Sequence, residues 1–309
     1  MDISEALMGW NIRDFIPVKT AIVGSPRRTL ERHVIESDGR KYILECIHPI
    51  RRERREGIAE ILESLHSSGS PVEHYLVSHT GRYVFGEGSY QWMLKEYVGG
   101  YQLERPKYLN DSWRGSAASD FLLKLREHVP YNMWKPAHLP SFIAGMMSRL
   151  ERKNPDLYGR LVEPYMTIKE ILKKWDSLPH SFTHGDFHPM NIIWGNERIN
   201  AVIDWEFMGM RPEMYDVAMM LGCLGIEDPD GLFSPFAEEF LKGLKKAGFD
   251  AISWEYLPEM ILATRFAWMD EWIRNKDENT VSTEMGYLHI ISHYIDKIRI
   301  YFSNTQSRH

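Results

Sequence analysis

The chain has 309 residues, of which 43% are hydrophobic and 26% charged, with a formal net charge of −6. This composition is typical of a folded globular protein with one large domain or two unequal ones, and it excludes the disordered and fibrous classes. The negative net charge argues against nucleic acid as the main partner.

Cysteine usage and hydropathy indicate the cellular compartment in which the protein works. The two cysteines, Cys46 and Cys223, are far apart in sequence and form neither a disulfide framework nor a cysteine-based zinc module. The stretch MDISEALMGW lacks the basic start and apolar run of a signal peptide, and no segment approaches the ~18 apolar residues that cross a bilayer. We therefore expect no membrane partner and a reducing, cytoplasmic compartment.

Roughly the first hundred residues predict a small β-rich lobe that contains one helix. Short apolar runs alternate with turn signals, of which Asp38-Gly39 is the clearest hairpin turn and Thr80-Gly81 a second. Within RRERREGIAEILESLHSSG, apolar residues recur at the spacing of an amphipathic helix. These residues are Ile58, Ile61, Leu62 and Leu65. The Ser, Gly and Pro residues of 67–71 then end the helix.

The pattern is mostly helical from about residue 112 onward, as in PSFIAGMMSRLERK and VEPYMTIKEILKKWDSL. The exception is 191–205, where NIIW and NAVIDW flank a Gly195-Asn196 turn and predict a short hairpin. After Tyr215 the pattern is again helical. We place the lobe boundary near Gly99, which divides the chain into residues 1–98 and 99–309.

The stretch HGDFHPMNIIW at 184–194 carries the main chemical signal. His184, Asp186 and Asn191 have the spacing of the protein-kinase catalytic loop, in which Asp accepts the proton of the attacking hydroxyl and Asn holds magnesium. A second acid should follow a short hairpin to hold the metal that bridges the phosphates, and Asp204 stands there. Carboxylate and carboxamide oxygens suit a hard cation such as Mg2+.

The alternating His184, Asp186 and His188 also permit a metal-hydrolase interpretation. Zinc would need a further ligand and an open position for water, and no other His pair with ligand spacing is evident among the thirteen histidines. Asp186 by itself would more often be a loop aspartate bonded to its own backbone. Its combination with Asn191 and Asp204 favours the kinase interpretation.

HGDFHPMN, followed by VIDW and by Tyr215-Asp216, resembles the aminoglycoside phosphotransferase and choline kinase family, which has Gly where protein kinases have Arg. The resemblance implies an α+β, bilobal protein-kinase-like fold, with a small β-rich nucleotide-binding lobe and a larger helical lobe that binds the acceptor. It also implies an enzyme that transfers phosphate from ATP, or from GTP, with Mg2+ to a hydroxyl group of a small molecule.

The same resemblance implies roles for the residues of the loop and hairpin. Asp186 would be the catalytic base, and Asn191 and Asp204 would bind magnesium. Asp216 would brace the catalytic loop, and His184 would hold it structurally. GMRPEMYD at 209–216 is expected to form a loop beside the acceptor.

The β-rich lobe matches the family in one segment and departs from it in another. MLKEYVGG resembles the hinge, whose backbone at Glu96 and Val98 would hydrogen-bond adenine. In YILECI, however, Glu45 stands where the family usually has a lysine that contacts the phosphates, and a carboxylate there would repel ATP unless it were neutralised. Arg54 and Arg55 lie near the buried face of the helix, so we predict that one of them pairs with Glu45 and serves the phosphates.

The phosphate loop GSPRRTLERHVI is a second departure, because it has one glycine and a proline. The positive charges of Arg27 and Arg28 at its tip would compensate for the phosphate contacts that a Gly-rich turn would make. Relatives that resemble type II homoserine kinases also lack the lysine, so a small-molecule kinase remains the favoured function. The alternative is a catalytically weak or inactive nucleotide-binding protein, similar to a pseudokinase, in which Glu45 has weakened the site. The acceptor alcohol and the oligomeric state stay open.

Overall fold

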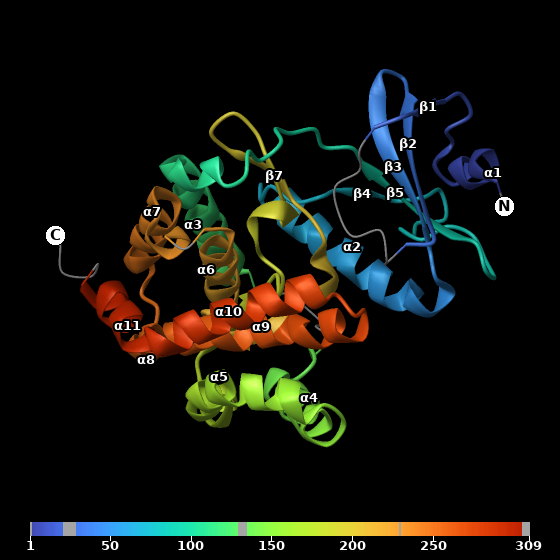
Figure 1. Ribbon diagram of the computed structural model, residues 1–309. Helices are drawn as coiled ribbons and strands as arrows, with labels where there is room; N and C mark the ends of the chain where they lie inside the picture. The colour runs from blue at the N-terminus through green and yellow to red at the C-terminus, as the bar shows by residue number, and fades with distance from the viewer. Residues whose placement is uncertain (1, 21–28, 129–134, 229, 305–309) are drawn as a thin grey trace. The chain divides into compact units, whose positions relative to one another are not determined.

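The computed structural model describes residues 2–20, 29–128, 135–228 and 230–304 (Figure 1). The chain forms two compact units, the first made of residues 1–102 and 190–206, and the second of 103–189 and 207–309. The single boundary expected at residue 98 takes no account of the hairpin at 190–206, which the sequence pattern placed in the helical lobe. That hairpin packs with the first unit.

Strands dominate the first unit and helices the second. The first unit contains α1 (Ile3–Leu7), α2 (Arg52–Ser67), β1 (Ile16–Val18), β2 (Glu31–Ser37), β3 (Arg40–Ile47), β4 (Tyr75–Leu76), β5 (Gln91–Glu96), β7 (Ile192–Trp194) and β8 (Ile199–Val202). The second contains α3 (Ser112–Glu127), α4 (Leu139–Lys153), α5 (Pro155–Lys174), α6 (Tyr215–Glu227), α7 (Pro235–Leu244), α8 (Ala251–Glu255), α9 (Leu257–Arg274), α10 (Glu278–His293), α11 (Ile295–Asn304), β6 (His180–Thr183) and β9 (Gly209–Pro212). Short 3-10 helices span Met8–Trp10, Pro49–Arg51, Lys107–Asn110, Trp175–Ser177, Pro189–Asn191, Trp205–Phe207, Gly231–Phe233 and Lys245–Ala247.

An antiparallel sheet in the order β1-β2-β3-β5-β4 organises the first unit. Its β2–β3 turn is Asp38-Gly39, as predicted, and both residues have positive φ, 52° and 72°, which suits a tight hairpin turn. The register pairs Ile43 of β3 with Lys95 of β5. Because side chains alternate along a strand, Glu45 lies on the same face of the sheet as Lys95.

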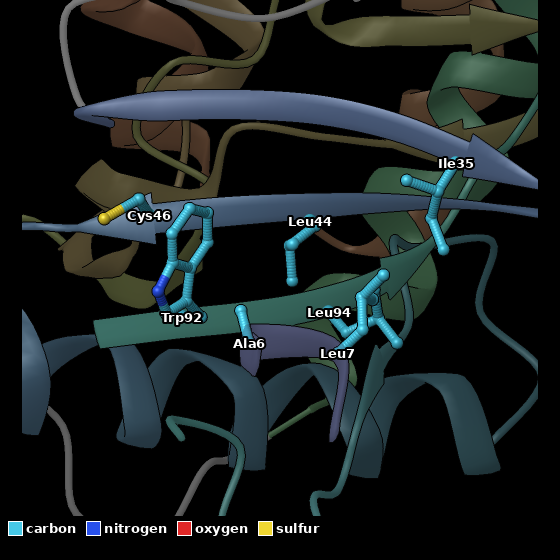
Figure 2. Close-up of a cluster of buried hydrophobic side chains, with 7 residues drawn as sticks. All are labelled: Ala6, Leu7, Ile35, Leu44, Cys46, Trp92 and Leu94. Carbon is cyan, nitrogen blue, oxygen red and sulfur yellow. The ribbon is translucent and has the colours of Figure 1, made fainter. Parts of the chain in front are cut away.

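The opposite face of this sheet packs against α1 and forms an apolar core (Figure 2). Its buried members are Ala6, Leu7, Ile35, Leu44, Cys46, Trp92 and Leu94. Leu44 and Cys46 flank Glu45 in β3, so the alternation that buries them in the core directs Glu45 to the other face. The core therefore fixes the register on which the polar face depends.

The second unit is built around α6 and α9, most of whose residues are buried. Two short strands that the sequence pattern did not predict, β6 and β9, pair antiparallel and align Thr183 with Gly209. The loop expected at 209–216 is therefore partly a strand, and it leads directly into α6. Among the described residues, the helices are too short or too polar to cross a membrane.

Candidate active site

The loop that begins at His184 follows β6 in the second unit and is held by Asp216 in the first turn of α6. The backbone N–H groups of His184 and Gly185 donate to the two carboxylate oxygens of Asp216 at 2.6 and 2.8 Å. Burial raises the pKa of Asp216 to about 6, although these two hydrogen bonds and the charge of Arg211 oppose the increase. The loop conformation therefore depends on one buried carboxyl group.

Gly185 has a φ of 83°, a region in which side chains are strained. A Cβ atom at this position would also overlap the carbonyl oxygen of Phe207. Both constraints explain why the loop has Gly where protein kinases have Arg.

We expect Gly185→Ala to lower the free energy of unfolding by about 1–3 kcal/mol or more. The strained backbone and the contact with Phe207 both oppose the added methyl group. Gly159→Ala in α5 is the matched control, because nothing lies within 4 Å of the position that its methyl group would take. That variant should gain up to about 1 kcal/mol in helix propensity. Denaturant unfolding of both variants measures the difference, and equal stabilities would contradict the argument.

Asp186 is buried, with 5% of its surface exposed. Its N–H donates to Nδ1 of His184 at 3.2 Å, and its Oδ1 lies 3.6 Å from Nε2 of His188. Phe187 anchors the loop by stacking on Phe121, with ring centroids 5.5 Å apart. In this arrangement His184 orders the loop through its side chain, whereas Asp186 bears the carboxylate that can act as a base.

The geometry does not support the zinc interpretation of HGDFH. Nδ1 of His184 already accepts the backbone N–H of Asp186. Within the described residues, the one group of three possible metal-binding side chains with ligand atoms all within 4.8 Å lies elsewhere, in the first unit.

The hairpin β7–β8 brings Asn191 and Asp204 together in the first unit. Asn191 directly precedes β7 and Asp204 follows β8 by two residues, and the N–H of Ile203 donates to the carbonyl of Asn191 at 2.9 Å. Asp204 has a φ of 69°, and its N–H donates to Oε1 of Glu73 at 3.3 Å. A non-glycine residue held in this region of backbone space suggests a functional constraint. The two oxygen-bearing side chains have the donor chemistry that Mg2+ requires.

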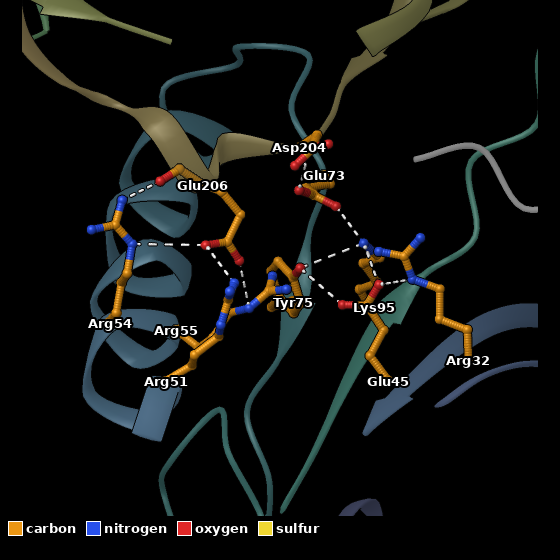
Figure 3. Close-up of polar contacts among 10 residues, drawn as sticks. All are labelled: Arg32, Glu45, Arg51, Arg54, Arg55, Glu73, Tyr75, Lys95, Asp204 and Glu206. Carbon is orange, nitrogen blue, oxygen red and sulfur yellow. Dashed lines mark hydrogen bonds and ion pairs between the residues drawn. The ribbon is translucent and has the colours of Figure 1, made fainter. Parts of the chain in front are cut away.

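Glu45 is fully buried in a charged network on the polar face of the sheet (Figure 3). Its Oε1 accepts from Nε of Arg32 at 2.7 Å and lies 3.1 Å from Nζ of Lys95. Lys95 also donates to Oε2 of Glu73 at 2.6 Å, and the hydroxyl of Tyr75 donates to Oε2 of Glu45 at 3.3 Å. This carboxylate is therefore neutralised within its own unit.

The pKa values in the network follow from these contacts. Burial alone would raise the pKa of Glu45, but the charges of Lys95, Arg32 and Arg55 lower it to about 2. Burial alone would likewise lower the pKa of Lys95, but the carboxylates of Glu45 and Glu73 raise it. Both groups are thus charged at neutral pH.

The predicted pair between Glu45 and Arg54 or Arg55 is wrong. Nε of Arg55 lies 2.8 Å from Oε1 of Glu206, and Nε of Arg54 lies 3.7 Å from Oε2 of the same residue (Figure 3). Lys95 reaches Glu45 because diagonal neighbours on one sheet face are within range of long side chains. The sequence pattern missed Lys95, although the register of β3 with β5 would have revealed it.

The hinge segment borders a small cavity of about 40 Å³ in the first unit. Its lining residues are Ile43, Glu73, Lys95, Glu96, Tyr97, Val98, Ile193 and Ile203. The N–H of Glu96 donates to the carbonyl of His74 at 3.0 Å, so this N–H is already used within the first unit. Arg27 and Arg28, predicted at the phosphate loop, lie outside the described residues.

A sequence profile of the phosphotransferase enzyme family, APH, matches residues 24–257. The chain belongs to this phosphotransferase family. The predicted membership is therefore confirmed. A search of curated proteins found no match.

Solved structures similar to this phosphotransferase share its fold at low sequence identity. Amicoumacin kinase hAmiN, in complex with AMP-PNP, Ca2+ and Ami, is 16% identical with a TM-score of 0.63, over 88% of this chain and 89% of that one. A thermostable mutant of aminoglycoside phosphotransferase APH(4)-Ia, in a ternary complex with ADP and hygromycin B, is 12% identical with a TM-score of 0.67, over 94% of this chain and 98% of that one. Spectinomycin phosphotransferase APH(9)-Ia with ADP and spectinomycin is 14% identical with a TM-score of 0.59, over 97% of each chain. These likenesses confirm the predicted α+β protein-kinase-like fold.

Proposed function

We propose that this phosphotransferase transfers the γ-phosphate of ATP to a hydroxyl group of a small molecule in an Mg2+-dependent reaction. The observation that carries the proposal is the end of the β7–β8 hairpin, where the N–H of Ile203, the residue before Asp204, donates to the carbonyl of Asn191. Membership of the phosphotransferase family supports the reaction class. The similar structures of an antibiotic kinase and two antibiotic phosphotransferases contain AMP-PNP or ADP, which supports an adenine nucleotide.

In the proposed reaction, Asp186 orients the acceptor hydroxyl and accepts its proton as the oxygen forms a bond to the γ-phosphorus. The bond between the γ-phosphorus and the leaving oxygen of ADP breaks in the same transfer. His184 and Asp216 maintain the loop through the hydrogen bonds described above. Asn191 and Asp204 would hold Mg2+, which when bound neutralises charge on the phosphates.

Nucleotide binding would use the hinge and the polar face of the sheet. The carbonyl of Glu96 can accept from the adenine amino group, and the N–H of Val98 can donate to a ring nitrogen. Lys95 removes the repulsion that Glu45 would otherwise exert on the triphosphate. Of the two α2 arginines, Arg54 is 37% exposed and Arg55 7%, so we propose Arg54 for phosphate contact.

The remaining phosphate contacts would come from Arg27 and Arg28, which we retain from the sequence pattern as proposed ligands. Guanidinium groups suit this role because their planar donors match phosphate oxygens.

A thermal unfolding titration tests the nucleotide site. With Mg2+, ATP at about 100 times its dissociation constant should stabilise the wild type by roughly 2.7 kcal/mol. Asp204→Ala should abolish the Mg2+-dependent part, because it removes a carboxylate ligand. Asp14→Ala, which removes an exposed aspartate of the same unit, is the control and should behave as the wild type. If neither ATP nor GTP stabilises the wild type, the proposal is wrong.

The pseudokinase-like alternative depends on Glu45 and makes a different prediction. It requires nucleotide binding without transfer, so added alcohols would produce no ADP above the background rate. Turnover that depends on both Asp186 and an added alcohol would exclude it.

A further inference from the structure

A second cluster of potential metal ligands lies in the first unit, apart from Asn191 and Asp204. Glu63 and His66 lie one turn apart on α2, and His74 lies just before β4. The ligand atoms of these three residues all lie within 4.8 Å of one another. The imidazole rings of His66 and His74 stack with centroids 4.2 Å apart and planes 4° apart, and Nε2 of His74 lies 3.1 Å from Oε2 of Glu63.

We propose that Glu63, His66 and His74 bind a transition-metal ion such as Zn2+. Two imidazoles and one carboxylate form a donor set that zinc and related ions prefer, whereas Mg2+ prefers oxygen donors alone. Residues at i and i+3 share one helix face, so α2 presents Glu63 and His66 together. Three protein ligands leave a further coordination position for water.

The surroundings of His74 add an independent feature of a metal site. Its Nδ1 is buried and has no hydrogen-bond partner in the described part of the chain. Oε2 of Glu96 lies 3.7 Å from this nitrogen, and the Glu96 side chain is 44% exposed and can approach it. Metal-binding imidazoles commonly donate their other N–H to a carboxylate, which fixes the tautomer and the ring orientation.

Side-chain rotation would close the site around an ion. Donor atoms around tetrahedral zinc lie roughly 3.3 Å apart, given metal–ligand distances near 2.0–2.1 Å. His66 is exposed in the last turn of α2, so its ring can tilt out of the stack without moving the backbone. No local sequence pattern indicates the pair, because eight positions separate the two histidines and the chain reverses direction between them.

The position of the site suggests what bound metal would do. His74 accepts the N–H of Glu96 through its carbonyl at 3.0 Å, and Glu96 ends β5 at the hinge. An ion held by the cluster would therefore join the end of α2 to the strand that carries the hinge. The proposed metal site is based on the geometry of its three ligands and does not depend on the proposed kinase activity.

Zinc titration of the full chain tests the proposal. The protein is stripped of metal with a chelator and titrated with Zn2+ against a chromophoric competitor, in excess Mg2+ so that oxygen sites are filled. We expect one equivalent of Zn2+ in the wild type and at least a tenfold loss of affinity in His66→Ala and Glu63→Gln. His48→Ala, an exposed histidine of the same unit, is the matched control and should bind as the wild type.

Replacing Zn2+ by Co2+ adds a spectroscopic measurement that reports on the ligands of the bound ion. The visible absorption of the bound ion should appear in the wild type and in His48→Ala, and it should be lost in His66→Ala. Circular dichroism verifies that each variant is folded. If the wild type binds no Zn2+ in excess Mg2+, or if His66→Ala and Glu63→Gln bind it as tightly as the wild type, the assignment is overturned.

Discussion

Replacement of Asp186 by Asn should lower kcat about 10²–10⁴-fold, because the amide cannot accept the proton of the acceptor hydroxyl. The KM for ATP should change little, since the proposed nucleotide contacts come from the hinge and from the hairpin residues Asn191 and Asp204. The buried loop should persist, because Asn keeps the size of Asp and because the backbone bonds to Asp216 do not involve the residue 186 side chain. Steady-state assays of ADP formation with a panel of alcohols measure both constants.

The control for this variant is Asp120→Asn, which alters an exposed aspartate on α3 of the same unit. It should retain the wild-type kcat. Circular dichroism and denaturant unfolding of both variants separate loss of chemistry from loss of fold. An Asp186→Asn enzyme that keeps more than about a tenth of the wild-type kcat would show that another group performs the proton transfer, since general base catalysis contributes more than this.

Replacement of Lys95 by Met should destabilise the first unit by about 3–5 kcal/mol, because it removes one partner of a buried charged network. The ammonium of Lys95 lies 3.1 Å from Oε1 of Glu45 and 2.6 Å from Oε2 of Glu73. Without it, two buried carboxylates share one fewer cation. Denaturant unfolding at neutral pH measures the loss.

The stability of the wild type should also decrease as the pH falls below about 4.5. The pKa of Glu45 is lowered from 4.5 to about 2 in the folded protein, so the ionised carboxylate stabilises the fold above about pH 4.5. This contribution, about 3 kcal/mol by linkage, is lost as the pH falls from 4.5 towards 2. In Lys95→Met the folded-state pKa of Glu45 should rise towards its ordinary value, so this acid-dependent contribution should be smaller than in the wild type and its loss should be complete at a higher pH.

Two variants serve as controls for Lys95→Met. Lys41→Met removes an exposed lysine of β3 and should change stability by less than about 0.5 kcal/mol. Adding Glu45→Gln to Lys95→Met should restore part of the loss, because it removes one of the uncompensated charges. If the double variant is as unstable as the sum of the single variants, the two side chains do not interact.

The sequence predicted those parts of the molecule whose signals are local. Asp38-Gly39 determines its own turn conformation, and the apolar spacing of 58–65 defines a helix whatever surrounds it. The spacing of His184, Asp186 and Asn191 is a local signal of the same kind, and the proposed catalytic role of Asp186 rests on it. The short strands β6 and β9 were missed because four residues are too few to show alternation, and they are strands only because they pair with each other.

The charged and metal-binding clusters could not be predicted because their members are distant in the sequence. Lys95 and Glu45 come together through the β3–β5 register, which is set by the apolar core on the other face of the sheet. His66 and His74 meet because the chain turns back after α2. In both cases a tertiary contact, and no local pattern, places the partner.

The two-segment construction of the first unit affects how the protein folds as it is synthesised. The N–H of Val202 donates to the carbonyl of Pro71 at 2.8 Å, and the N–H of Glu73 donates to the carbonyl of Val202 at 3.2 Å. The strand that supplies these bonds leaves the ribosome only after residues 103–189, which take on the order of ten seconds to translate. Until then the nascent sheet has an unpaired edge at 71–73, where a chaperone that binds extended peptide would compete with the late hairpin for the same backbone groups.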